Sequence, residues 1–293
     1  MAQYKAALAR MDARGARTYL EGDQSLTIAR NGKTLRERRR SVVIARDGAK
    51  VLLRTRHGGL AEEEVELSLP PAYYVIRSRR IGGPYYLPKS QEQIGDGESR
   101  TVSAYNDNML GAPYSLLYHR ISQLLKEPGL AITSVQPERS GSKGMWKMSF
   151  RMKADSPSLG QGSGWFIVDP DMGWALLSFE FRSAEDTTTV SSGRVSYGRQ
   201  VDGLPVPKEV ETTDKTLVGS DTYITKARLD IKKFEWGPYP EEEFTLDYYK
   251  LGDLARSTPG GGGARGIVLL LLAALLLGLS IYVKRYLKPQ PAP

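Results

Sequence analysis

The sequence predicts a mainly β (α+β) fold: a curved, half-open antiparallel β-sheet with an N-terminal helix, one internal helix and a single C-terminal transmembrane helix. Three observations predict it. Segments in which apolar and polar residues alternate follow one another along most of the chain. Turn signals such as Asn31-Gly32 and Asp47-Gly48 separate these segments by only a few residues. One long apolar run stands near the C-terminus.

The chain begins with the spacing of a short amphipathic helix, because Tyr4, Ala7, Leu8 and Met11 fall at positions i, i+3, i+4 and i+7. Strands follow it, and the glycines of the Asn-Gly and Asp-Gly pairs supply the positive φ that tight hairpin turns need. A loop rich in Gly, Pro, Gln and Ser is expected over residues 82–99. The strands expected in this half are residues 17–30, 33–46, 50–57, 62–69 and 72–80.

Residues 113–126 are predicted to form the internal helix. Pro113 suits the first helical position, and Pro128-Gly129 ends the helix. We expect this helix to pack on one face of the sheet through an apolar stripe. The stripe consists of Leu117, Ile121, Leu124 and Leu125.

The second half again predicts strands, and their close succession indicates antiparallel pairing because parallel strands need long crossovers. Along residues 145–152 the even positions are apolar, so they form the buried face of a strand. Residues 168–174 carry the turn residues of a hairpin. The strands expected here are residues 130–137, 145–153, 164–169, 174–182, 190–200, 206–214, 222–236 and 243–248.

The C-terminal part predicts a membrane anchor. Residues 266–283 contain no charged residue, and a helix of that length measures about 27 Å, close to the thickness of a bilayer core. The chain is therefore expected to be a single-pass membrane protein. The domains expected are a β domain at residues 1–250, a Gly-rich linker at 251–265, the transmembrane helix at 266–283 and a basic, Pro-rich tail at 284–293.

The side of the membrane is weakly indicated. Lys284, Arg285 and Lys288 follow the span, which favours a cytoplasmic C-terminus and a β domain on the exocytoplasmic or periplasmic side. Residues 1–20 contain no apolar run of signal-peptide length. Two alternatives stay open: a tail-anchored protein that faces the cytoplasm, or a chain whose true start lies upstream.

Composition excludes several classes of site. Cysteine is absent, and His57 and His119 are the only histidines, which excludes thiolate chemistry and multi-histidine metal sites. Neither a nucleophile elbow nor a phosphate-binding loop occurs. We therefore predict no enzyme activity, cofactor or metal; an esterase-like enzyme would need a Ser–His pair. Glutamate triplets at 62–64 and 241–243 are expected at solvated edges.

The densest charge feature is a group of arginines on two neighbouring expected strands. Arg36, Arg38 and Arg40 share one face of the first strand, and Arg54 and Arg56 share a face of the next. We expect these five residues either to contact anionic headgroups of the lipid bilayer or to form a solvated sheet face. No nucleic-acid-binding module is recognisable, so nucleic acid is not a predicted partner.

Aromatic residues mark the core of the predicted sheet, and five of them are candidates for the lining of an apolar cavity: Trp146, Phe150, Trp165, Trp174 and Phe179. If the sheet is curved and unclosed, its concave side together with a helix would enclose such a cavity. Ordinary core packing is the alternative.

Four segments carry a resemblance to a known family. They are Ser25–Arg30 before the first turn, Ser41–Ile44 before the second, Gly173–Glu180 and Asp202–Lys208. In order and spacing, residues 4–236 resemble the LolA-like outer-membrane lipoprotein carriers, a group that includes LppX-type proteins and the sensor-like domains of sigma-factor regulators. The C-terminal run adds a resemblance to membrane-anchored bacterial proteins of this general build. The resemblance implies a helix followed by a half-open barrel that holds acyl chains. Soluble carriers lack a C-terminal span, so shuttling is not expected.

Two functional hypotheses follow. The first is a non-enzymatic, membrane-anchored domain that binds lipid or lipoprotein acyl chains in an apolar half-barrel. The alternative is a membrane-tethered protein-interaction or scaffold domain without a ligand cavity. The sequence leaves the ligand, the protein partner and the oligomeric state open.

Overall fold

The structure is a computed structural model that describes residues 1–58, 61–69, 72–87, 115–116, 119–138, 144–153, 161–184 and 189–252. The chain divides into two compact units, residues 1–245 and 246–293. Every helix and strand described for this chain lies in the first unit. In the second unit, residues 246–252 make tight turns, in which the Tyr249 N–H donates to the Leu246 carbonyl at 3.1 Å.

Six strands of the sheet come from the N-terminal half. They are β1 (Arg17–Arg30), β2 (Lys33–Asp47), β3 (Lys50–His57), β4 (Glu63–Leu69), β5 (Ala72–Ser78) and β6 (Tyr85–Tyr86). The first five match the predicted strands, whereas β6 lies in the segment predicted to be a loop. Asn31 and Gly32 have φ of 49° and 79°, and Gly48 has φ of 61°, as their turn pairs predict.

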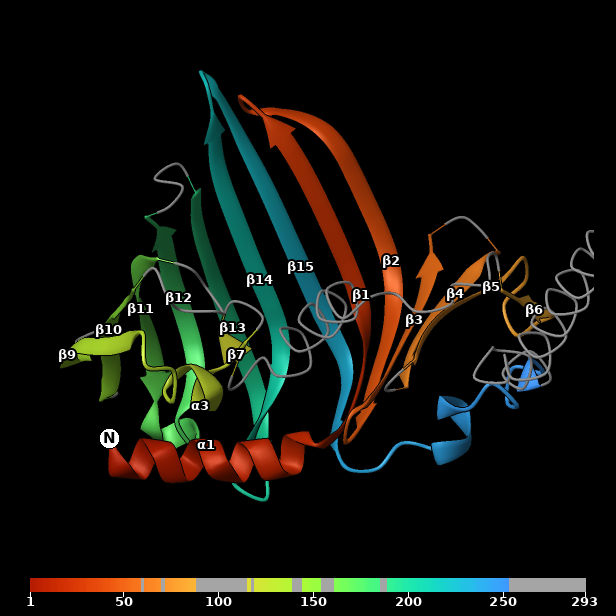
Figure 1. The fold of residues 1–293 in the computed structure, drawn as a ribbon, viewed down its shortest axis with the longest axis horizontal. Helices are drawn as coiled ribbons and strands as arrows, with labels where there is room; N and C mark the ends of the chain where they lie inside the picture. The colour runs from red at the N-terminus through yellow and green to blue at the C-terminus, as the bar shows by residue number, and fades with distance from the viewer. Residues whose placement is uncertain are drawn as a thin grey trace, which may run out of the picture. The chain divides into compact units, whose positions relative to one another are not determined.

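The C-terminal half adds seven strands. They are β9 (Leu130–Glu138), β10 (Met145–Met152), β11 (Gly162–Asp169), β12 (Ala175–Ser183), β13 (Thr189–Val201), β14 (Leu204–Val218) and β15 (Asp221–Trp236). The short 3₁₀ helix η1 (Pro170–Met172) joins β11 to β12. Because β15 pairs with β1, the described strands form one open antiparallel sheet in the order β6-β5-β4-β3-β2-β1-β15-β14-β13-β12-β11-β10-β9 (Figure 1). The predicted antiparallel sheet is confirmed.

The predicted N-terminal helix is α1 (Ala2–Gly15), which crosses the ends of the strands of the C-terminal half (Figure 1). Its apolar positions are buried, and the Tyr4 ring lies 6.2 Å from the Phe166 ring and 5.7 Å from the Trp174 ring. Leu8 and Met11 belong to the same cluster, named core cluster 1 here. The face of the sheet that contacts α1 is the helix face, and the other is the opposite face.

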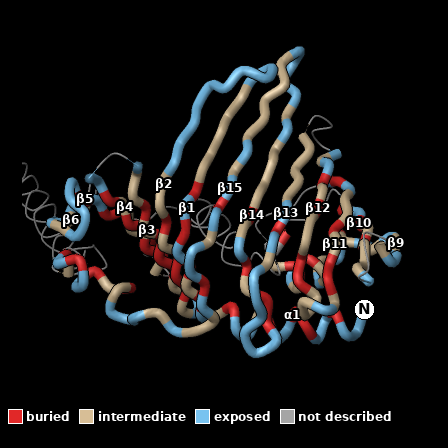
Figure 2. The backbone as a smooth tube through the Cα atoms, turned by 180° about the vertical axis from the view of Figure 1, so that it is seen from behind, coloured by how far each residue is buried: buried red, intermediate tan, exposed pale blue. Residues whose placement is uncertain are grey.

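A second cluster continues on the helix face across the central strands. Val195 pairs with Val210, and Val210 pairs with Leu229, so these side chains share a face with Phe179, whose partner Gly193 precedes Val195 by two residues. Four strands, β1, β2, β14 and β15, extend past this buried region. The residues in their extensions are half-buried or exposed (Figure 2). Core cluster 2 consists of Leu20, Val42, Ile44, Leu53, Val195, Val210, Leu229 and Phe234.

The predicted helix over residues 113–126 is wrong. The described residues of this segment form two short strands, β7 (Ser115–Leu116) and β8 (His119–Arg120), and then the single turn α3 (Ile121–Leu124). Leu116, Ile121 and Leu124 are nevertheless buried in core cluster 1. Burial of these side chains outweighs helix propensity, which is a weak determinant for a short segment.

The predicted strand at residues 243–248 is also wrong. The 3₁₀ helix η2 (Glu241–Phe244) and tight turns occupy this region. Phe244 is buried, and its ring meets the edge of the Tyr239 ring at 5.9 Å. A compact turn thus buries Phe244, and burial of this side chain does not require a strand.

The prediction of a single-pass membrane protein is corrected. In the part of the chain that the structure describes, no helix combines the length and the apolar character that crossing a bilayer requires. The expected span at residues 266–283 and the tail at 284–293 lie outside the described residues, as does most of the expected linker. The structure therefore gives neither the transmembrane helix nor a membrane-anchored location any support.

Candidate functional site

Arg36, Arg38 and Arg40 of β2 are called the arginine row here. Two of them border apolar residues on the helix face. Arg36 stands opposite Ile28 and Arg38 opposite Leu26 in the ladder between β2 and β1, and ladder partners share a face. Both arginines are exposed, whereas Leu26 and Ile28 are half-buried. Leu26 also pairs with the half-buried Ala227 of β15. We call these five residues the amphipathic strip.

Arg40 lies nearer the core and joins the strip to it. Its Nε donates to Gln24 Oε1 at 2.5 Å, and Gln24 is also its ladder partner. On its other side, Gln24 stands opposite Leu229 of core cluster 2. The arginine row therefore lies on the helix face, and the strip continues the apolar surface of core cluster 2 toward the far end of β1 and β2.

Arg54 and Arg56 lie on the opposite face. Arg40 pairs with His57, whereas Arg56 pairs with Ser41. Because successive residues of a strand alternate between faces, Arg56 and Arg54 point away from the row on β2. The structure does not bring the five arginines together.

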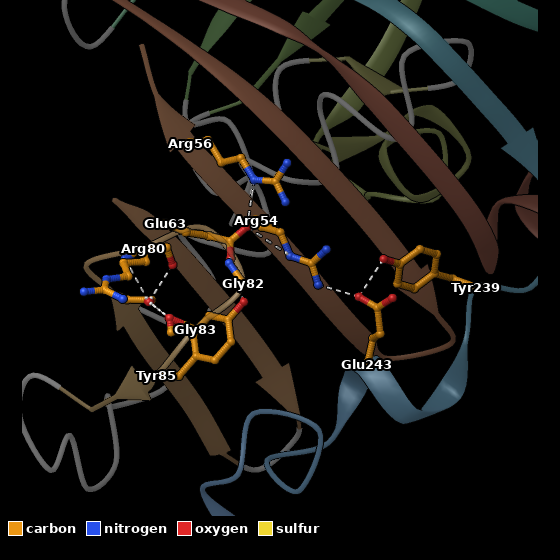
Figure 3. Close-up of polar contacts among 10 residues, drawn as sticks. Arg54, Arg56, Glu63, Arg80, Gly82, Gly83, Tyr85, Tyr239 and Glu243 are labelled. Carbon is orange, nitrogen blue, oxygen red and sulfur yellow. Dashed lines mark hydrogen bonds and ion pairs between the residues drawn. The ribbon is translucent and has the colours of Figure 1, made fainter. Parts of the chain in front are cut away.

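Arg54 and Arg56 surround Glu63, a buried carboxylate whose side chain is 1% exposed (Figure 3). Glu63 Oε1 accepts from Arg56 Nε at 2.8 Å and lies 3.8 Å from Arg54 Nε, while Oε2 accepts from the Tyr85 hydroxyl at 2.6 Å. Burial raises the pKa of Glu63, but these hydrogen bonds and the two positive charges outweigh it and hold the pKa below its usual value. The expected solvated edge is wrong for this residue.

The same network holds η2 on the opposite face. Arg54 forms an ion pair with Glu243, and the Tyr239 hydroxyl donates to that carboxylate at 2.8 Å (Figure 3). The Tyr239 ring stacks on the Tyr19 ring of β1 with centroids 5.0 Å apart. The largely buried Arg54 thus meets two largely buried carboxylates, and the half-exposed Arg56 reaches one of them from the surface, which is a structural arrangement.

The predicted cavity residues separate into two groups. Phe150 and Phe179 are buried on the helix face, and Trp146 and Trp174 pack against the same core cluster 1. Side chains of α1 and α3 fill the space beside these four. Trp165 lies on the opposite face, where Lys147 Nζ is 4.5 Å from its ring centre. Phe150 and Phe179 are therefore packed core residues, and Trp146 and Trp174 are partly buried at the edge of the same cluster.

Two cavities of about 630 and 720 Å³ lie beside the middle of β2 and the C-terminal end of β3. Glu37, Arg39, His57 and Gly58 line both of them, and the other lining residues include acids and bases in each wall. Acidic and basic residues are equal in number among the lining residues of each cavity, and none of the five predicted cavity residues lines either of them.

The same region offers little for catalysis. Within the described ranges, no hydrogen bond joins His57 to a serine, and no group of three His, Asp or Glu residues is placed to hold a metal ion. The side chain of His119 lies outside the described residues. An acyl-transfer mechanism would need a nucleophile within hydrogen-bond reach of a base.

No protein-family model and no curated protein matches the chain. Solved structures do resemble it. A DUF1329 family protein from Desulfovibrio piger has 12% sequence identity and a TM-score of 0.46, with 85% of this chain and 98% of that chain covered. A LolA superfamily protein from Nitrosomonas europaea has 10% identity and a TM-score of 0.39, with 83% and 97% covered.

A third similar structure is the Pseudomonas aeruginosa MucA/MucB complex, with 8% identity, a TM-score of 0.26, and 78% of this chain and 93% of that chain covered. The predicted resemblance to LolA-like proteins is confirmed, because a LolA superfamily protein is among the similar structures. At these identities and TM-scores the likeness concerns the fold alone.

Proposed function

We propose that this chain is a non-enzymatic binding protein for an anionic lipid or a lipoprotein acyl chain, which lies along the amphipathic strip of the open sheet. The observation that carries the proposal is the pairing of Arg36 with Ile28 and of Arg38 with Leu26 on one face. An acyl chain laid on Leu26, Ile28 and Ala227 would remove half-buried apolar surface from water.

The arginines supply the second part of the recognition. Arg36 and Arg38 are exposed beside the apolar line, so an anionic headgroup at the end of the acyl chain would meet two guanidinium groups. Each basic residue near an anionic lipid surface contributes about 1 kcal/mol to the free energy of binding. The apolar line and the charged border together favour an anionic amphiphile over a neutral one.

Native mass spectrometry of the full chain mixed with lysophosphatidylglycerol tests the proposal. We expect a one-to-one complex that weakens at least severalfold in the double variant R36Q/R38Q, because both headgroup contacts are removed. The control variant K5Q/R10Q removes the same charge from exposed positions of α1 and should bind as the unmodified chain does. Equal binding by the two variants, or no complex at all, would overturn the proposal.

The second candidate is the protein-interaction domain without a ligand cavity. One observation favours it: residues of α1 and α3 belong to the same buried cluster as Phe150 and Phe179, so described side chains already pack against these two predicted cavity residues. This candidate gains support if the full chain takes up no lipid and remains folded. A lipid complex that depends on Arg36 and Arg38 would exclude it as the sole function.

A further inference from the structure

The sheet divides where β14 and β15 part. Their ladder ends at the pair Glu209 and Asp230, although β14 begins at Leu204 and β15 continues to Trp236. Figure 1 shows the two strands diverging toward the end of the sheet where α1 lies. A cavity of about 360 Å³ lies in this fork and is lined by residues from both strands and from β13.

Four cations line the fork, and three of them are bulge residues. Lys208 is an extra residue of β14 in its ladder with β13, and Lys232 is an extra residue of β15 in its ladder with β1. Arg199 lies in a two-residue stretch of β13 that faces a single residue of β14. Bulges often stand beside functional sites because they redirect a side chain. Here three separate irregularities place a cation on one cavity.

The fork carries an excess of positive charge. Lys232 pairs with Asp23 at 2.7 Å, and Lys233 pairs with Glu235 at 3.1 Å. Arg199 and Lys208, which are exposed, form no ion pair within the described residues. Glu235 is the only carboxylate among the lining residues. An anion in the fork would therefore meet Arg199 and Lys208 without displacing a carboxylate from either of them.

The floor of the cavity is apolar. Phe234 belongs to core cluster 2, and Val206 and Ile231 pack against it. All three line the same cavity as the cations. Its volume is at the lower end of the range that small-molecule sites occupy. An anionic group attached to a short apolar part matches both the charged rim and this floor.

We propose that the fork between β14 and β15 binds a phosphate group through Arg199 and Lys208, with an attached apolar part on Phe234. Arginine and lysine are the side chains that most often bind phosphate, through forked hydrogen bonds and point charge respectively. The phosphate has two sources, a phospholipid headgroup or free phosphate. This site is separate from the amphipathic strip and does not depend on the proposed function.

Isothermal titration calorimetry of the full chain distinguishes the two sources. One arm uses dihexanoyl phosphatidic acid as a monomeric amphiphile, and the other uses inorganic phosphate. We expect saturable binding of the amphiphile, at least tenfold tighter than that of phosphate, because only the amphiphile contacts the apolar floor. Equal affinity for both would place free phosphate in the fork and would exclude the lipid source.

Variants test the residues. R199Q/K208Q should weaken binding at least tenfold, whereas the control K5Q/R10Q should change it less than twofold. R36Q/R38Q should also leave it unchanged, so that failure of this site is distinct from failure of the amphipathic strip. Circular dichroism checks that each variant is folded. No saturable binding of either probe, or equal loss in R199Q/K208Q and the control, would overturn the proposal.

Discussion

Two glutamates of β4, three residues apart, have opposite pKa shifts. Glu63 is buried among Arg54, Arg56 and Tyr85, and these partners lower its pKa although burial raises it. On the other face, burial raises the pKa of Glu66, and the hydrogen bond that Tyr73 donates at 2.5 Å does not outweigh it. The partners decide whether a buried carboxylate prefers its charged form.

Glu63→Ala should destabilise the protein by about 3 kcal/mol, because the largely buried Arg54 and the Tyr85 hydroxyl then lose a carboxylate partner and the half-exposed Arg56 loses its ion pair. Urea unfolding at neutral pH measures the loss. Glu62→Ala, at the exposed neighbouring position, is the matched control and should change stability by less than about 0.5 kcal/mol. A similar cost for both variants would mean that the network contributes nothing measurable.

Glu66→Gln should give a pH-dependent gain in stability. The folded pKa of Glu66 is raised, so its favourable contribution is complete below the unfolded pKa of about 4.3 and is lost as pH rises through the folded pKa. The variant removes this loss and keeps an acceptor for Tyr73. We expect it to exceed the unmodified chain in urea melts at pH 7 and to match it near pH 4. A difference that does not vary with pH would contradict this assignment.

For single residues, the sequence predicts which charged side chains could form a network better than it predicts their burial and their partners. The alternation of Glu63, Val65 and Leu67 places the carboxylate on the same face as two buried apolar residues, and this signal marks Glu63 as buried. A run of three glutamates suggests a solvated edge instead. The partners Arg54 and Arg56 lie on β3, and only the register between strands, which the sequence does not encode locally, brings them to Glu63.

Among the elements, α1 contributes mainly through packing, beside two long ion pairs that Asp12 and Arg14 form with Arg120 and Asp202. It makes no ladder hydrogen bonds, and Tyr4, Leu8 and Met11 are buried against the aromatic residues of β11 and β12. The helix spacing predicts these contacts. The same reasoning fails at residues 113–126, where Ile121 and Leu124 of the predicted stripe are buried, but the described residues form two short strands and one helical turn. Periodicity identifies which side chains are buried more reliably than it identifies the backbone that buries them.

Leu8→Ala should cost about 3 kcal/mol, within the range for a fully buried leucine that leaves a cavity. Urea unfolding provides the measurement. Arg10→Ala is the control at an exposed position of the same helix, where both residue types favour a helix. It should lower the free energy of unfolding by less than about 0.5 kcal/mol. If the two variants behave alike, α1 is not packed as the structure describes.

The strands themselves follow the sequence closely, but their irregularities do not. Alternation and Gly-containing turns locate β1 to β5 and β9 to β15 within a few residues. The bulge at Lys232 has no signal in the sequence, because no glycine or proline stands beside it, whereas Pro207 marks a break next to Lys208 without showing which side chain it redirects. The fork between β14 and β15 arises from how three strands pair and was therefore beyond sequence reasoning.

At the scale of the whole molecule, an open sheet offers two faces with different chemistry. On the helix face the arginine row borders apolar residues, whereas on the opposite face Arg54 and Arg56 are engaged by Glu63 and Glu243. The net charge of +8 therefore does not act as one basic surface. The arginines of β2 and β3 have the same spacing but lie on different faces, because the register pairs Arg40 with His57 and so turns Arg56 to the opposite face.

This division predicts how salt affects lipid binding. The Debye length falls from about 10 Å at 0.1 M salt to about 3 Å at 1 M, so the exposed Arg36 and Arg38 should be screened while apolar contacts with Leu26 and Ile28 persist. Lysophosphatidylglycerol should therefore bind severalfold more weakly at high salt. Lysophosphatidylcholine, with the same chain and no net charge, should change little. Fluorescence titration measures both, and anionic binding that is insensitive to salt would remove the arginine row from the mechanism and leave the apolar line alone to explain affinity.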